Sequence, residues 1–215
     1  MKTKLDLVNW NRREHFEVFS QYEEPFHGIN FEVELSAVYH RAKRSGDSFY
    51  LSYLYRCLMA VHEIENLHYR IEGEDIYHYE RINGSSTIAR DDHTFGFAFL
   101  PWAETLGEFQ RLAHEEMARV RSVSGLAIND QTFRPDAIHV SAIPWIPFSG
   151  LTHARKYSRL DSAPKVSFGQ CQWRGEELWM SVAVFVHHGL VDAYHVGQFY
   201  QVFQALLKQP DLPNS

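Results

Sequence analysis

Segments of two-residue period and segments of helical period follow one another along the 215 residues. Residues 29–35 alternate between apolar and polar side chains as a half-buried strand does, whereas residues 49–67 place apolar side chains at the spacing of a largely buried helix. Residues 102–123 also have the helical period, with acidic residues early and basic residues late, as the helix dipole favours. The order of these elements predicts a mixed α/β protein in which helices cover one sheet.

Two further regions complete the first two thirds of the chain. Residues 36–46 have helical character, with Ser36 as the expected cap and Gly46 as the expected stop. Residues 67–100 hold four short alternating pieces separated by polar or glycine-containing turns. This spacing of short strands and turns predicts an antiparallel meander.

The last third predicts three strands and a closing helix. The strands are expected at residues 137–145, 164–173 and 178–188, and the third is apolar on both faces, which places it in the centre of a sheet. Residues 191–209 have helical period. Four apolar residues share one face of this helix: Val196, Phe199, Tyr200 and Phe203.

Composition narrows the class of protein. Hydrophobic residues make up 45% of the chain, enough for one core, so a single domain over residues 1–215 is expected. The net charge of −6, without a long block of lysine or arginine, disfavours a nucleic-acid or membrane-surface partner.

No apolar run approaches the ~20 residues of a membrane span, so we expect a cytoplasmic protein. Cys57 and Cys171 are expected as core thiols.

Two adjacent histidines, His187 and His188, close the third of these strands, and Asp192 follows four positions later. Histidine titrates near neutral pH, so one placed where a strand ends is a candidate general base. With 13 histidines in the chain, an adjacent pair is weak evidence on its own. A metal site needs further converging ligands, which Asp192 and His195 do not supply automatically, and a hydrolase elbow of the type G-x-S-x-G does not occur. A histidine acting alone as base, beside a carboxylate that needs a cationic partner if buried, fits best.

The pattern H-H-x-x-x-D followed by Y-H-V, together with "NWNRREHF" near the start and "VSAIPW" between them, resembles the chloramphenicol acetyltransferase family. The matching segments cover almost the whole chain in that family's order. The resemblance implies an α+β two-layer sandwich, the fold of coenzyme A-dependent acyltransferases, assembled as a homotrimer with active sites between subunits. It implies transfer of acetyl from acetyl-CoA to the hydroxyl of a small molecule, without a metal.

The resemblance also implies roles for particular residues. His188 takes the proton from the acceptor hydroxyl while that oxygen attacks the thioester. Ser141 donates to the oxyanion that this attack creates, and Ser167 stands where the family has a threonine that holds a water nearby. Asp192 is implied to pair with Arg12, which supports the position of the histidine; without the resemblance, Arg12 reads as a solvated helix start.

Binding residues follow from the same resemblance. Tyr50 and Trp145 match positions close to the coenzyme. Phe19, Phe95 and Ile128 match apolar positions of the acceptor pocket. Each of these side chains otherwise reads as part of an ordinary core, which is the commoner fate of such residues.

The chain departs from the family at the residue after the motif aspartate and at two positions near the coenzyme. Ala193 replaces a glycine after the motif aspartate, which should cost on the order of 1 kcal/mol if φ there is positive and nothing if φ is negative. Ser48 and Gln170 replace lysines near the 3′-phosphate of the coenzyme. Candidates for compensation are Lys43, Arg44 and Arg174.

The acceptor pocket departs as well, because its positions carry His139, His153, Asp161 and Lys165. Unpaired polar groups are costly beside an aromatic acceptor, so a more polar acceptor is an alternative. A second alternative is a catalytically weak trimeric binding protein of the same fold, which Ala193 and the missing lysines motivate.

Overall fold

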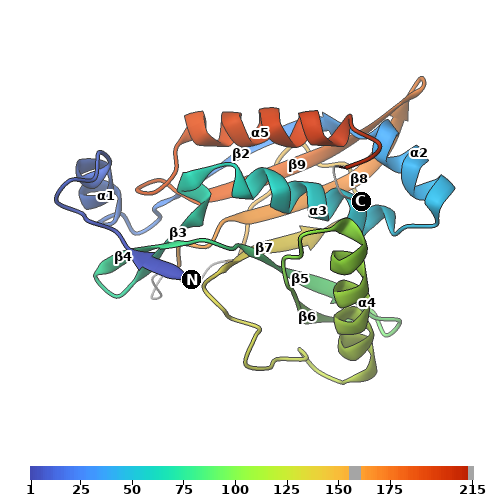
Figure 1. The fold of residues 1–215 in the computed structure, drawn as a ribbon, viewed down its shortest axis with the longest axis horizontal. Helices are drawn as coiled ribbons and strands as arrows, with labels where there is room; N and C mark the ends of the chain where they lie inside the picture. The colour runs from blue at the N-terminus through green and yellow to red at the C-terminus, as the bar shows by residue number, and fades with distance from the viewer. Residues whose placement is uncertain (155–160, 213–215) are drawn as a thin grey trace.

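The computed structural model describes residues 1–154 and 161–212. Within these residues, six strands form one mixed sheet in the order β2-β9-β8-β7-β5-β6 (Figure 1). β5 and β8 both run parallel to β7, and the other neighbours are antiparallel. The strands of this sheet are β2 (Phe26–Glu34), β5 (Asn83–Ala89), β6 (Phe95–Leu100), β7 (Ala137–Ala142), β8 (Lys165–Arg174) and β9 (Glu177–His187).

Helices cover one face of this sheet (Figure 1). They are α2 (Ser36–Ser45), α3 (Phe49–His62), α4 (Leu106–Ser122) and α5 (Ala193–Leu207). The short helix α1 (Arg13–Phe19) lies apart from this layer, at the end of the sheet (Figure 1). The predicted two-layer α+β architecture is therefore confirmed, and the strand that ends in the histidine pair is an interior strand, as its two apolar faces indicate.

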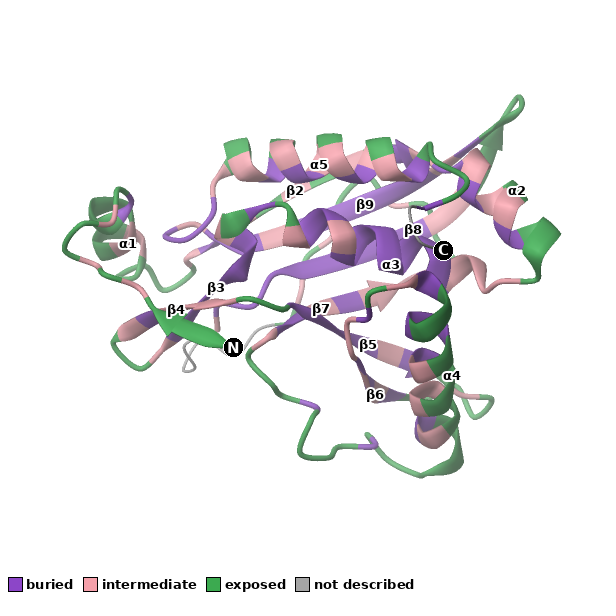
Figure 2. Cartoon of the chain, in the orientation of Figure 1, coloured by how far each residue is buried: buried purple, intermediate pink, exposed green. Residues whose placement is uncertain are grey.

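Alternation along β9 separates two environments. Val182, Val184 and Val186 point into the core beneath the helices and are at most 2% exposed. The intervening residues, such as Ala183 and Phe185, lie on the opposite face. No helix among the described residues covers that opposite face, and only the loop after β7 crosses it, where the Phe148 backbone N–H donates to Ser181 Oγ at 3.3 Å. Figure 2 shows α3 and β9 as the most buried elements.

The predicted meander over residues 67–100 is wrong in its pairing. A second sheet in the described part of the chain has the order β1-β4-β3, with β1 (Lys2–Lys4), β3 (Tyr69–Glu72) and β4 (Asp75–Tyr79). β4 does not pair with β5, because β5 lies between β6 and β7 in the large sheet. Alternation fixes which face of a strand is buried but leaves its partner open, so two hairpins in different sheets give the same pattern as one meander.

Helix boundaries are close to those expected, with two differences. α3 ends at His62, and residues 65–68 form a separate short 3₁₀ helix. Ser36 is the first residue of α2 and not its cap, because its Oγ accepts from the Leu178 backbone N–H at 2.8 Å and ties α2 to β9. Gly46 ends α2 in the left-handed conformation, at φ 78°, as expected.

Two histidines make stability depend on pH: His62 at the end of α3 and His68 in the 3₁₀ helix that follows. His62 donates from Nδ1 to the Leu58 carbonyl at 2.7 Å and accepts at Nε2 from the Ile82 N–H at 3.0 Å, a pattern that only the neutral ring satisfies. Burial lowers the pKa of His62 to about 4 and also lowers the pKa of His68. Below about pH 6.5 the unfolded chain therefore binds more protons than the folded chain.

We expect the free energy of unfolding to fall as pH decreases from 6.5 toward 4, by up to about 1.4 kcal/mol per pH unit for His62 alone. Urea unfolding at several pH values measures this slope. His62→Asn should flatten it, whereas replacing the exposed His15 should leave it unchanged. A wild-type slope of zero between pH 6.5 and 5 contradicts the prediction.

Candidate functional site

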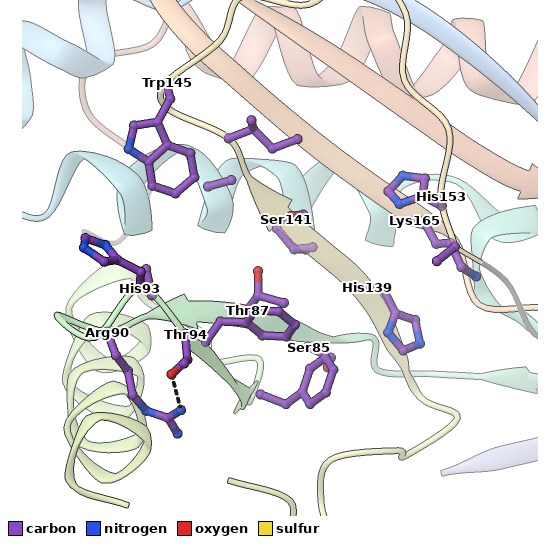
Figure 3. Close-up of a pocket in the computed structure, with 17 residues that line it drawn as sticks. Ser85, Thr87, Arg90, His93, Thr94, His139, Ser141, Trp145, His153 and Lys165 are labelled. Carbon is purple, nitrogen blue, oxygen red and sulfur yellow. Dashed lines mark hydrogen bonds between the residues drawn. The ribbon is translucent and has the colours of Figure 1, made fainter. Parts of the chain in front are cut away.

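A cavity of about 780 Å³ opens on the sheet face that lacks helices (Figure 3). Its floor is built by β5, β7 and β8, whose alternation turns polar side chains toward it. Ser141 on β7 lies on this floor and pairs in register with Ser167 on β8. Ser167 is fully buried, and its Oγ lies 3.4 Å from His153 Nε2. The two serines singled out from the sequence are thus neighbours on one face of the sheet.

His188 follows the end of β9 and is held from three sides. Its backbone N–H donates to the Pro25 carbonyl at 2.8 Å. Its ring stacks on Phe19 with centroids 4.0 Å apart and an interplanar angle of 18°, and the His27 ring lies 4.4 Å away. His188 Nδ1 is buried and has no hydrogen-bond partner among the described residues. Proton exchange with a substrate must therefore use Nε2.

An ion pair lies beneath the turn that carries His188. Arg12 Nη1 lies 2.6 Å from Asp192 Oδ2, and Arg12 Nη2 donates to the His188 carbonyl at 3.2 Å. Arg12 is only 8% exposed, so it is no solvated helix start. Burial acts to raise the pKa of Asp192, but the hydrogen bond from Arg12 and the nearby positive charge outweigh it, and the pKa is lowered. The pair links α1, the turn and α5 around His188.

The same carboxylate starts α5. Asp192 Oδ1 accepts from the Tyr194 N–H at 3.0 Å, and His195 Nδ1 accepts from the Asp192 N–H at 3.2 Å, which forms a capping box. Ala193 is the first residue of α5, and among the described residues only His93 and Ala127 combine a side chain with positive φ. The replacement of glycine by Ala193 therefore adds no backbone strain.

Loss of the Arg12 partner should destabilise the protein, because Asp192 is partly buried and would keep an unpaired charge. We expect Arg12→Met to lower the free energy of unfolding by roughly 1–3 kcal/mol, less than for a fully buried pair since the Asp192 side chain is 31% exposed. Urea unfolding near pH 7 measures the change. Arg13→Met is the matched control, because Arg13 is exposed and pairs only with Glu17 on the same helix. Equal losses in the two variants contradict the prediction.

The residues expected near the coenzyme do not lie together in one chain. Trp145 is 70% exposed and lines the cavity (Figure 3). Tyr50 lies within α3 on the other side of the sheet, where its hydroxyl is 2.6 Å from Ser86 Oγ, and it does not line the cavity. Ser48 caps α3 by accepting from the Leu51 N–H. Arg174, one candidate for compensation, is paired with Glu32.

Of the residues expected around the acceptor, some line the cavity and others do not. Phe95 and His139 line the cavity. Ile128, 54% exposed, follows α4 and is not among the lining residues. Phe19 contacts His188 and does not line the cavity.

Sequence reasoning missed His27, the second ring against His188. On β2, His27 has the same phase as Ile29, Phe31 and Val33, which pack toward the core. Its Nε2 lies 3.2 Å from the Val191 carbonyl, and burial lowers its pKa. The sequence did contain a signal for His27, because a histidine at a strand position that otherwise holds core-facing apolar residues is unusual.

Within one subunit, His188 and Ser141 are far apart. Ser141 aligns with Ser167, and Ser167 aligns with Ala183, so two strand spacings and five residues along β9 separate it from His188. Strand spacing of about 4.8 Å and a rise of about 3.3 Å per residue give a separation on the order of 15–20 Å. One chain therefore cannot place both side chains on the same substrate atom.

The described residues contain no group of three or more histidine, cysteine or acidic residues that could hold a metal ion. None of the helices that the structure describes is long and apolar enough to cross a membrane.

Comparisons with known proteins give a consistent result. The family model described as "Chloramphenicol acetyltransferase" matches residues 1–204. The chain is 24% identical over 205 residues to chloramphenicol acetyltransferase 3 of Escherichia coli, covering 95% of this chain and 96% of that protein. It is 22% identical over 201 residues to the chloramphenicol acetyltransferase of Proteus mirabilis, covering 93% and 92%. A solved chloramphenicol acetyltransferase superposes with a TM-score of 0.89 at 28% identity, covering 97% of this chain and all of that chain.

Proposed function

The chain belongs to the chloramphenicol acetyltransferase family, a family of acyltransferases, and we propose that it transfers acetyl from acetyl-CoA to a hydroxyl of a small-molecule acceptor with His188 as general base. The observation that carries this proposal is the His188 ring, clamped between Phe19 and His27 with Nδ1 buried. A fixed imidazole that exchanges its proton through one nitrogen suits a base that acts on a bound hydroxyl. We also propose that the reaction takes place in the cytoplasm, where acetyl-CoA is available.

The reaction proceeds in one addition and one elimination. The acceptor oxygen forms a bond to the thioester carbonyl carbon while His188 Nε2 takes the hydroxyl proton. Ser141 Oγ donates to the oxyanion of the tetrahedral intermediate. The C–S bond then breaks, the coenzyme leaves as its thiol with the proton from His188, and the acceptor leaves as its acetyl ester. No acyl-enzyme forms.

The site is built between copies of the chain. The separation of His188 and Ser141 within one subunit supports a homotrimer in which His188 of one subunit reaches the cavity of the next. We assign Arg12 and Asp192 as positioning residues for this histidine. Ser167, buried beside Ser141, supports the same oxyanion, Trp145 contacts the coenzyme, and Tyr50 acts only through the packing of α3 on β5.

The oxyanion role of Ser141 provides the test. We expect Ser141→Ala to lower kcat by about 10²–10³-fold with little change in KM, because the lost donor acts only on charge that exists in the transition state. Release of the coenzyme thiol from acetyl-CoA, with chloramphenicol as reference acceptor, measures the rate. Ser122→Ala is the matched control, because the exposed Ser122 hydroxyl bonds the Arg119 carbonyl and does not line the cavity. Wild-type kcat in Ser141→Ala overturns the assignment.

One argument for the alternative, a weakly catalytic trimeric binding protein, was that Ala193 would strain the backbone. Ala193 does not have a positive φ, so this argument no longer applies. The replacement of two coenzyme-side lysines by Ser48 and Gln170 remains in its favour. Equal acetyl-CoA turnover by wild type and His188→Ala would support it.

A further inference from the structure

We infer that the acceptor is a polyhydroxylated molecule such as a sugar or polyol, an inference that rests on the proposed acetyl transfer and concerns the same cavity. The carrying observation is an ordered polar array on the cavity floor (Figure 3). One row crosses three strands in register, with Ser85 on β5, His139 on β7 and Lys165 on β8. Thr87 and Ser141, two residues further along β5 and β7 on the same face, form a second row.

Neighbouring members of a row stand about 4.8 Å apart, the spacing of paired strands. Within this polar array, Ser85, Thr87, His139, Ser141 and Lys165, the hydroxyls of Ser85, Thr87 and Ser141 therefore offer hydrogen-bonding positions to a ligand at fixed intervals. A ligand that satisfies more than one of them must carry several polar groups. The strands hold these positions rigidly, which favours recognition by geometry.

The hydroxyls of the array are available to a ligand. Those of Ser85, Thr87 and Ser141 make no hydrogen bond to any other described residue, although Ser85 is only 3% exposed. A hydroxyl both donates and accepts, so its natural partner is another hydroxyl. Covering such groups with an apolar ring leaves them unpaired, at a cost of about 1–3 kcal/mol each.

The two cations that line the cavity differ in their partners. Lys165 Nζ lies 2.6 Å from Asp161 Oδ2 and also donates to the Ala163 carbonyl at 3.2 Å, so its charge is compensated inside the protein. Arg90 donates to the Val120 and Gly125 carbonyls and to Thr94 Oγ1, and its Nη2 has no hydrogen-bond partner among the described residues, so it can donate to an oxygen of the acceptor. His153 lines the wall, and burial lowers its pKa, which leaves a neutral ring able to donate and accept.

Aromatic walls complete the fit. Phe95 and Phe97 on β6 border the array on one side. The C–H faces of a sugar ring are apolar, whereas its edges carry hydroxyls. A cavity with flat apolar walls and a floor of hydroxyls and imidazoles matches both parts of such a molecule.

The test compares acceptors with the intact protein and acetyl-CoA. The panel holds the methyl glycosides of glucose, galactose and mannose, sorbitol, and chloramphenicol. We expect kcat/KM for at least one sugar or polyol to exceed that for chloramphenicol tenfold or more. A larger kcat/KM for chloramphenicol than for every other member overturns the inference and leaves the proposed acetyl transfer intact.

A paired variant identifies the array as the cause. Ser85→Ala with Thr87→Val removes two hydroxyls at nearly constant volume and should lower kcat/KM for the preferred sugar at least tenfold, while that for chloramphenicol should not fall, because an aromatic acceptor then covers no unpaired hydroxyl there. Ser122→Ala is the control. Equal losses for both acceptors, or none, contradict the array's role.

Binding separates the two proposals when turnover is absent. Saturation-transfer NMR reports contact between the methyl glycosides and the protein without catalysis. Sugar binding that weakens in the paired variant, together with acetylation no faster than in His188→Ala, supports the inference and refutes the acetyl transfer. Neither binding nor acetylation of any sugar or of sorbitol refutes the inference.

Discussion

Replacing His188 with alanine is expected to lower kcat for acetyl transfer by about 10²–10⁴-fold, the range typical of a lost general base. No neighbouring imidazole stands in for it. His27 Nε2 faces the Val191 carbonyl at 3.2 Å, and His187 Nδ1 accepts from the Gly189 N–H at 3.2 Å in a ring that is 4% exposed. The rate is followed as coenzyme thiol released from acetyl-CoA in the presence of the best acceptor.

The fold should survive this substitution, because the ring lies beyond the end of β9 and outside the core beneath the helices. Circular dichroism and the melting temperature check this point. His15→Ala serves as the matched control, since His15 is exposed on the neighbouring helix α1 and should retain full activity. Equal kcat in wild type and His188→Ala refutes the role of the base.

Co-assembly of two inactive chains is expected to restore activity. Trimers that mix His188→Ala subunits with Ser141→Ala subunits contain interfaces at which an intact histidine meets an intact serine. Every mixed trimer, of either composition, has both intact residues at one of its three interfaces, so about a third of the wild-type activity should return once unmixed trimers are removed. This value exceeds the activity of either parent by one to three orders of magnitude, given the losses expected for each substitution.

The experiment needs two different affinity tags, co-expression, and purification through both tags in succession. Its control is a mixture of the separately purified parents without subunit exchange, which should stay inactive. A site contained in one subunit predicts only the mean of the two parental rates. Recovery no greater than that mean therefore refutes the shared site, and a monomer in solution refutes it as well.

Features that depend on residues close together in the chain could be predicted from the sequence alone. The stop of α2 at Gly46 follows from the freedom of glycine at positive φ, and the interior position of β9 follows from its two apolar faces. Helical period located α4 and α5 to within a few residues. The motif around His188 also indicated the family, because its residues and spacing are contiguous in the chain.

Features that join distant parts of the chain needed the folded structure. Local sequence patterns do not predict three contacts of the folded chain. These are the pairing of β5 with β7, the buried ion pair of Arg12 with Asp192, 180 residues away, and the contact of His27 with His188. The separation of His188 from Ser141 belongs to the same class. Period and propensity arise from each residue and its near neighbours, whereas partners across the sheet are chosen by the packing of the whole chain, which local patterns do not encode.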